Sequence, residues 1–167
     1  MNNHLKTNRN IWKFLFLNIV TIGVYNIIML TVLGQELNTI AGPHDGRKTM
    51  HFFLMLLLMP FTLGISLLVW MHKFSGRIAI ELKRRNAVLP FPFGASTFWL
   101  WNLVWTAVFG SVFAMFVFVA VASGGNVNIL FFMIILLGIS VVVGPHIYIF
   151  RLFAAMNTLA ADYNTNG

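Results

Sequence analysis

The chain has 167 residues, of which 59% are hydrophobic and 9% are charged. Soluble globular proteins carry about 25% charged residues, so this composition excludes a water-soluble domain and predicts a single membrane domain over residues 1–167. The net charge of +7 comes from basic residues beside apolar segments, so we expect anionic lipid headgroups, and not nucleic acid, as the counter-charge.

The first half of the chain predicts two membrane-spanning helices. Residues 11–34 contain one charged residue, Lys13, and as a helix they span about 36 Å, enough for a hydrocarbon core of about 30 Å. This run is longer than the apolar region of a signal peptide, so we interpret it as a retained span. Residues 35–50 form a connection, and a second span covers residues 51–71 with Pro60 inside it.

An amphipathic helix at the membrane surface is expected over residues 72–86. Phe74, Ile78 and Leu82 recur every four residues and form its apolar row. Its basic residues predict a surface for anionic headgroups or an acidic partner. They are Lys73, Arg77, Lys83, Arg84 and Arg85.

The second half predicts a tight helical hairpin. Pro90 and Pro92 exclude a helix between the amphipathic helix and the third span. The expected elements are a third span at 97–122, a turn at 123–128, a fourth span at 129–150 and a helical extension at 151–163. The predicted fold is therefore an all-α integral membrane protein with four transmembrane helices as two antiparallel hairpins.

The distribution of basic residues predicts the orientation of these spans. With a cytoplasmic N-terminus, nine of the 11 basic residues lie on the cytoplasmic side, and Arg47 and Lys48 lie outside. Tryptophans mark alternating starts and ends of the spans, among them Trp12 and Trp70, which supports an even number of crossings. We expect a multi-pass protein with both termini cytoplasmic.

Two short phrases recur along the chain. Thr21-Ile22-Gly23-Val24 and Thr62-Leu63-Gly64-Ile65 are offset by 41 residues, and they would form an inverted pair if they lie in adjacent antiparallel spans. Inverted repeats are typical of transporters. Leu37-Asn38-Thr39-Ile40-Ala41 is echoed by Met156-Asn157-Thr158-Leu159-Ala160.

These phrases carry a resemblance to a family. The motifs R-x-x-W and T-x-G-V-Y at residues 9–25, and T-L-G followed by Trp70, resemble an uncharacterised family of small bacterial integral membrane proteins. The tail is similar too, with Phe93-Gly94-Ala95-Ser96, Ala155-Met156-Asn157 and Asp162-Tyr163-Asn164. The resemblance implies the bacterial inner membrane and no particular chemistry.

Polar residues inside the spans have two interpretations. Asn18, Thr21 and Tyr25 share one stripe of a helix, which lines a pathway or makes interhelical hydrogen bonds. Small and polar residues in the later spans predict packing seams, and the partner is a helix of the same chain, a second copy or another membrane protein. The residues of these seams are Asn102, Thr106, Gly110, Ser140 and Gly144. His146 lies near the inner end of the fourth span, at the depth of His72, without the ligand spacing of a metal site.

Catalysis is not supported by the residue inventory. The chain has four acidic residues, none of them in mid-membrane, and no cysteine, so neither paired acid–base chemistry nor a thiol nucleophile is expected, and no cofactor is implied. We expect a non-enzymatic scaffold, regulatory or assembly subunit with a basic cytoplasmic face. The alternative is an oligomeric channel or passive transporter. Its pathway would be lined by Asn18, Thr21, Tyr25, Thr62, Ser66, Asn102 and Thr106.

Overall fold

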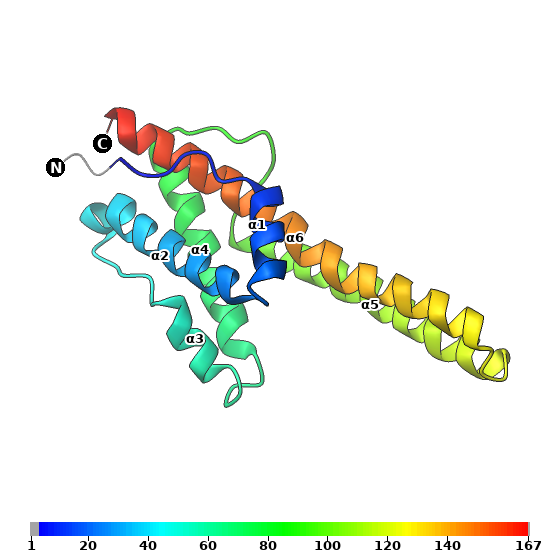
Figure 1. Ribbon diagram of the computed structural model, residues 1–167. Helices are drawn as coiled ribbons and strands as arrows, with labels where there is room; N and C mark the ends of the chain where they lie inside the picture. Colours follow the sequence, from blue (N-terminus) through cyan, green and yellow to red (C-terminus); the bar gives the residue numbers. More distant parts are fainter. Residues whose placement is uncertain (1–3, 167) are drawn as a thin grey trace. The chain divides into compact units, whose positions relative to one another are not determined.

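The computed structural model describes residues 4–166, apart from the side chains of residues 140–145, and the described part contains α-helices and no strand (Figure 1). The helices are α1 (Ile11–Val20), α2 (Val24–Asp45), α3 (Phe52–Leu58), α4 (Ile65–Arg84), α5 (Ala95–Ala122) and α6 (Val127–Asn166). The chain divides into two units, one made of Met1–Phe98 with Phe150–Gly167 and the other of Trp99–Ile149. The predicted all-α class is confirmed.

The first unit contains two helical hairpins where single spans were expected. The run 11–34 is not one helix, because α1 ends at Val20 and α2 begins at Val24. The run 51–71 is interrupted in the same way, since α3 ends at Leu58 and α4 begins at Ile65. We call α1 with α2 the first hairpin and α3 with α4 the second hairpin.

Each hairpin turns on two consecutive left-handed residues. Ile22 and Gly23 have φ of 51° and 87°, and Leu63 and Gly64 have φ of 49° and 84°. In both turns the glycine N–H reaches the carbonyl five residues back, the 6→1 bond of a Schellman helix end. The left-handed position usually holds glycine, but an isoleucine or a leucine occupies it here, which costs roughly 1–2 kcal/mol per turn.

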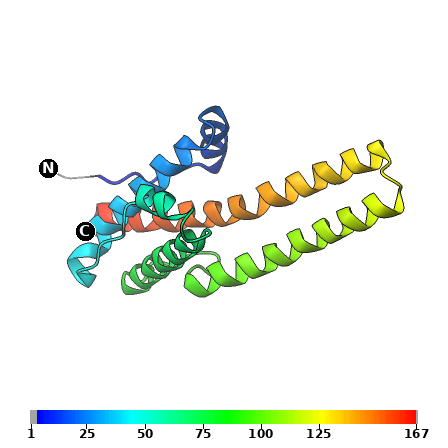
Figure 2. The same cartoon turned by 90° about the horizontal axis from the view of Figure 1, so that it is seen from below.

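The two turns share the same main hydrogen bonds at the offset of 41 residues. In both, the threonine Oγ1 donates to the carbonyl four residues back (Leu17, Leu58) and accepts the N–H four residues on (Tyr25, Ser66). Both turns lie away from the chain termini in the two views (Figures 1 and 2). The hairpins therefore have the same orientation, and the inverted arrangement expected for adjacent spans is wrong, because each turn reverses the chain within its own apolar run.

The echoed pentapeptide also has one structural role in its two places. Asn38 on α2 accepts the N–H of Thr49 at 2.6 Å and donates to its carbonyl at 3.2 Å. Asn157 on α6 does the same with Arg9, at 3.1 Å for both bonds. We call this pairing of one side-chain amide with one backbone residue an asparagine clip. Each clip ties down the extended segment that leads into a hairpin, and it satisfies backbone groups that no helix pairs.

The residues around each clip match as well. Thr39 and Thr158 both donate to the carbonyl four residues back, at 3.2 and 3.0 Å. The apolar members of both pentapeptides are buried. They are Leu37, Ile40 and Ala41 on α2, and Met156, Leu159 and Ala160 on α6. Asn164 makes a third clip to Leu5, with both bonds at 2.8 Å, so the end of α6 is tied to the N-terminal segment.

The core of the first unit joins both hairpins to the end of α6. Phe14 of α1 packs edge-on against Phe153 of α6, with ring centroids 5.2 Å apart. Phe74, Ile78 and Leu82 are buried, as their spacing predicts. Trp70 was expected at the membrane interface, but it is 5% exposed and donates to the carbonyl of Met50 at 2.8 Å.

Helix boundaries differ from the expected ones where tertiary contacts extend a helix. The amphipathic helix 72–86 is the continuation of α4, which begins after the turn. α2 continues past Pro43 to Asp45 and ends at Gly46, whose φ of 64° suits a left-handed cap. The connection is therefore shorter than residues 35–50. The extended stretch around Pro90 and Pro92 is confirmed.

The second unit is a helical hairpin closed by a turn over residues 123–126. α5 is confirmed over the third expected span, and its most apolar window has mean hydropathy 2.3 and is 0% buried. Among the described residues it is the one helix long and apolar enough to cross a membrane, with shorter apolar stretches at Ile11–Val20 and Val127–Ile139. Trp101 and Trp105 stack along α5, with ring centroids 6.1 Å apart.

The turn glycines provide a test of the hairpins. We expect Gly23→Ala and Gly64→Ala each to lower the free energy of unfolding by about 1 kcal/mol, because a Cβ is strained at positive φ. Gly42→Ala is the control, since Gly42 lies within α2 and a Cβ added there would meet no atom within 4 Å, so this change should be neutral or stabilising. Thermal unfolding in mild detergent measures all three. Equal effects at the three glycines would contradict the turn geometry.

Candidate functional site

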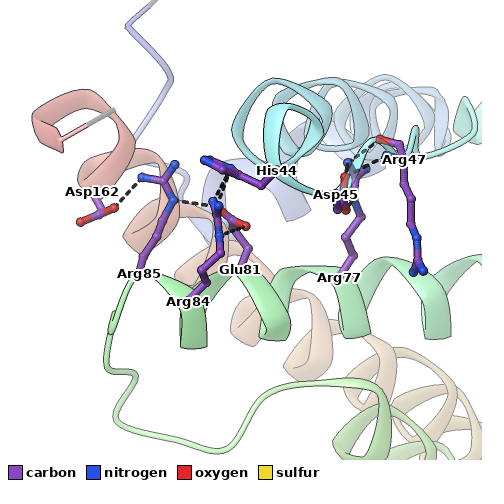
Figure 3. A network of polar contacts seen from close by, with 8 residues as sticks. All are labelled: His44, Asp45, Arg47, Arg77, Glu81, Arg84, Arg85 and Asp162. Carbon is purple, nitrogen blue, oxygen red and sulfur yellow. Dashed lines mark hydrogen bonds and ion pairs between the residues drawn. The ribbon is translucent and has the colours of Figure 1, made fainter.

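The charged residues of the chain gather in the first unit. No Asp, Glu, Lys or Arg occurs between Arg85 and Arg151. The first unit brings the charged side chains together from α2, α4 and α6, which places the ends of both hairpins beside each other (Figure 3). This charged end is the candidate site.

Arg77 is the centre of one half of the charged end. Its Nε lies 2.7 Å from Asp45 Oδ2, and its Nη1 donates to Asn38 Oδ1 at 2.5 Å and to Thr49 Oγ1 at 2.7 Å. The Nη2 donates to the Arg47 carbonyl at 2.6 Å. Hydrogen bonding from Arg77 holds the pKa of Asp45 below its usual range. Arg77 therefore joins α4 to the end of the first hairpin.

Glu81 is the centre of the other half. It is 3% exposed, and it accepts from Arg85 at 2.8 Å and from Arg84, which also contacts His44. Burial alone would raise the pKa of Glu81, but the hydrogen bonds from the two arginines outweigh it and the pKa is lowered. Glu81 pairs with Arg85 four residues later on α4, whereas Arg77, four residues earlier, pairs with Asp45 instead.

Arg85 extends the network to the C-terminal helix. Its Nη1 lies 2.7 Å from Asp162 Oδ2, and its guanidinium lies 5.6 Å from the ring centroid of Tyr163. The hydrogen bond from Arg85 lowers the pKa of Asp162. Figure 3 shows Arg85 between Glu81 and Asp162, so a single guanidinium joins α4 to α6.

A separate ion pair closes the first hairpin. The Arg9 side chain is fully buried, pairs with Glu36 and donates to Asn157 Oδ1 at 2.9 Å. Burial raises the pKa of Glu36 and lowers that of Arg9, and their mutual attraction offsets only part of each shift. The pair is therefore held in place by its surroundings as much as by its charge.

Arginines and lysines have different roles in this unit. All four acidic residues of the chain pair with arginines: Glu36 with Arg9, Asp45 with Arg77, Glu81 with Arg84 and Arg85, and Asp162 with Arg85. All five lysines are exposed. They are Lys6, Lys13, Lys48, Lys73 and Lys83. Of the basic surface expected on residues 73–85, the lysines alone keep the freedom to meet an external anion.

The polar side chains that the sequence placed on one stripe of residues 18–25 make local contacts. Thr21 is bonded within the first turn, and Thr62 and Ser66 bond one another at 2.9 Å in the second turn. Tyr25 lies beside Phe14, with ring centroids 6.0 Å apart. The Oδ1 of Asn18 is buried without a hydrogen-bond donor among the described residues. In the described structure, hydroxyl groups of these residues are therefore used in turn hydrogen bonds.

The remaining predicted residues lie in or near the second unit. Thr106 and Gly110 are exposed along α5, and Asn102 is half-buried on the same helix. His146 is half-buried in α6. Ser140 and Gly144 lie outside the residues whose side chains are described. Within the described residues, no three His, Cys, Asp or Glu side chains are grouped to hold a metal ion.

Sequence reasoning missed Asn38, Asn157 and the Arg9–Glu36 pair as organising residues. The echo of the pentapeptide was a usable signal, because an asparagine surrounded by buried apolar positions in two places indicates a shared contact. The pairing partner was not readable, since Asn157 and Arg9 are 148 residues apart.

One family model matches the part of the chain that contains both hairpin turns. Residues 9–80 match a family described as "Domain of unknown function (DUF4234)". The match runs from Arg9, which Asn157 clips, into α4, and so it covers both turns. No curated protein and no solved structure matches the chain.

Arg77 provides a test of the network. We expect Arg77→Gln to destabilise the protein by roughly 2–3 kcal/mol, because it leaves Asp45 and Thr49 without their charged donor in a partly buried site. Lys73→Gln, one turn earlier on the exposed side of α4, should change the unfolding free energy by less than about 0.5 kcal/mol. Denaturant unfolding in detergent measures both. Similar losses in both variants would show that Arg77 is another surface cation.

The carboxylates predict an acid limit to stability. The pKa values of Asp45 and Asp162 are lower in the folded than in the unfolded protein, so their contribution is present above the unfolded value and is lost as pH falls through the folded one. We expect Tm to fall below about pH 4. Asp45→Asn with Asp162→Asn should lower Tm at neutral pH and flatten this dependence, and Lys73→Gln should keep it. If the Tm of the double variant fell with acid as steeply as that of the wild type, Asp45 and Asp162 would not be the cause of the acid sensitivity.

Proposed function

We propose that the protein is a non-enzymatic membrane scaffold, embedded in a bacterial inner membrane, whose charged end faces the cytoplasm and engages anionic headgroups or an acidic partner. The observation that carries this proposal is the split between paired arginines and exposed lysines. Four of the six arginines, Arg9, Arg77, Arg84 and Arg85, pair with the acids and hold the hairpins together, whereas all five lysines are exposed and available to an outside partner.

The hairpins have the dimensions of insertions into half a bilayer. α1 has 10 residues, which as a helix rise about 15 Å, half of a hydrocarbon core of about 30 Å. The apolar part of α2, from Val24 to Gly34, has a similar length. We therefore propose that both hairpins enter one leaflet and return to the side from which they came.

Exposed side chains at the turns support this insertion. Ile22 is 94% exposed and Leu63 is 92% exposed, and Phe61 beside the second turn is 86% exposed. Large apolar side chains at the tip of a hairpin are unfavourable in water, and hydrocarbon is the solvent that suits them. Both turns pair backbone groups internally through the N–H groups of Gly23, Val24, Gly64 and Ile65, which lowers the cost of placing them in a membrane interior.

The proposed topology differs from four complete spans. α5 and the apolar part of α6 cross the membrane as a hairpin, and the residues between Arg85 and Arg151 carry no charge. Arg77 contacts Asp45 directly, so residues 35–50 and 73–85 share one side. All 11 basic residues then lie on that side, which supports a cytoplasmic location for it and for both termini.

The alternative function as a channel or passive transporter has weaker support. Its proposed lining includes Thr21, Thr62 and Ser66, whose hydroxyls are hydrogen-bonded in the turns. A side chain used to close a turn is a poor ligand for a passing solute. The scaffold proposal does not need these residues to be free.

The topology is testable because the chain has no cysteine of its own. Single cysteines replace the exposed residues Thr7, Lys48 and Asn126. In sealed inner-membrane vesicles we expect Thr7→Cys and Lys48→Cys to react with an impermeant maleimide from the same side and Asn126→Cys from the other. Cysteines on the outer face of the vesicles should be labelled before permeabilisation, and cysteines on the inner face only after it.

The control is Ile22→Cys, which should resist the reagent until detergent is added, since the turn lies in hydrocarbon. Labelling of Lys48→Cys from the side opposite to Thr7→Cys would restore four complete spans and overturn the proposal. Solute flux through reconstituted liposomes, absent from empty ones, would favour the channel.

A further inference from the structure

We propose that a cavity between the N-terminal segment and the first hairpin binds the phosphate group of an anionic membrane lipid. The cavity has a volume of about 160 Å³. A water molecule takes about 30 Å³ of liquid, so a tetrahedral phosphate group has room there. The lining residues are Lys6, Asn8, Arg9, Asn10, Lys13, Phe14, Tyr25 and Met29.

The charge of the cavity favours an anion. Lys6, Arg9 and Lys13 contribute three positive charges to the lining, which contains no acidic residue. The acid that faces them from α2 is Glu36, and Arg9 already pairs with it. Lys6 also lies near enough to Glu36 to oppose the rise in the pKa of that carboxyl, but among the described residues neither Lys6 nor Lys13 makes an ion pair with an acid. Two lysines without a direct carboxylate contact are the pattern expected for a phosphate site.

Arg9 gives an independent indication that a ligand oxygen belongs here. Its side chain is fully buried, and its Nη groups contact Lys6 O, Asn157 and Glu36. The Nε, in contrast, is buried with no acceptor among the described residues. A buried guanidinium N–H without a partner is costly. Arg9 also lines the cavity, so this incompletely paired guanidinium is a neighbour of an anion bound there.

The start of α1 adds to this site. Asn10 caps the helix by accepting the N–H of Trp12 at 2.7 Å, and both Asn10 and Lys13 of the first turn line the cavity. The N-terminus of a helix carries partial positive charge and favours anions. The cavity therefore combines a helix N-terminus with exposed lysines and a fixed arginine.

The apolar part of the lining indicates a lipid as the source of the phosphate. Phe14, Tyr25 and Met29 form one wall. Trp12 and Phe16 are 75% and 67% exposed on the same helix, so apolar surface continues from the cavity along α1. A free phosphate has no apolar group to bury against these side chains, whereas a phospholipid carries acyl chains next to its phosphate.

This inference rests on the proposed membrane insertion of the first hairpin. It adds a specific lipid site in the N-terminal segment to the general cationic surface that the exposed lysines of residues 73–85 provide. The two lysines of each region allow a matched comparison, since Lys73 and Lys83 are exposed on α4 and do not line the cavity.

The test is a titration of full-length protein in neutral detergent with short-chain phosphatidylglycerol, followed by thermal unfolding. Diacylglycerol with the same acyl chains and inorganic phosphate are titrated in parallel. We expect phosphatidylglycerol to raise Tm in a saturable way, and the other two to have little effect. In Lys6→Gln with Lys13→Gln the apparent affinity should fall about 30-fold, at about 1 kcal/mol for each lysine.

Lys73→Gln with Lys83→Gln is the control and should change the affinity by less than about 3-fold. Equal losses in both double variants would overturn the cavity but leave the general cationic surface, and with it the proposed function. No response of the wild type to phosphatidylglycerol would overturn the lipid site, and an equal response to inorganic phosphate would assign the cavity to free phosphate. The single variants Lys6→Gln and Lys13→Gln replace the double variant if it unfolds. Failure of membrane insertion would appear separately, in the cysteine labelling.

Discussion

The rest of the first unit depends on a turn that ends a helix inside an apolar run. A helix end leaves carbonyl groups without partners inside the helix. The two Thr-x-Gly turns solve this with the Schellman bond from the glycine N–H and with a threonine hydroxyl that both donates and accepts. Because two left-handed residues follow one another, the chain also reverses direction. Each apolar run then returns to the side where it began.

That reversal explains how the charged end is assembled. Asp45 at the end of the first hairpin meets Arg77 in the second, and Asn38 clips Thr49 between them. Asn157 and Asp162 bring α6 to the same end through Arg9 and Arg85. Arginine suits these positions because its planar fork serves several acceptors at once, as Arg77 does with Asp45, Asn38 and Thr49. Lysine, a flexible point charge, stays at the exposed positions.

The parts that local pattern predicted are those decided by local forces. α5, the turn at residues 123–126, the extended stretch around Pro90 and the buried row of Phe74, Ile78 and Leu82 follow from hydropathy, proline and four-residue spacing. The expected continuous helices at residues 11–34 and 51–71 were wrong, because a glycine within an apolar run is as common in a continuous membrane helix as at a reversal. Trp70 was misplaced for a similar reason, since a tryptophan next to basic residues is typical of an interface belt, and here the indole is buried against Phe52.

By itself the sequence determined the helical class, the apolar runs and the restriction of all charge to residues 1–85 and 151–167. It also contained both repeats, the Thr-x-Gly phrase and the pentapeptide, but it did not show that they form turns and asparagine clips. The tertiary structure alone decided that the apolar runs reverse, that four of the six arginines are paired internally and that the lysines remain exposed. The physical reason is that these features depend on contacts between residues far apart in the chain, such as Arg9 with Asn157, which helical periodicity does not encode.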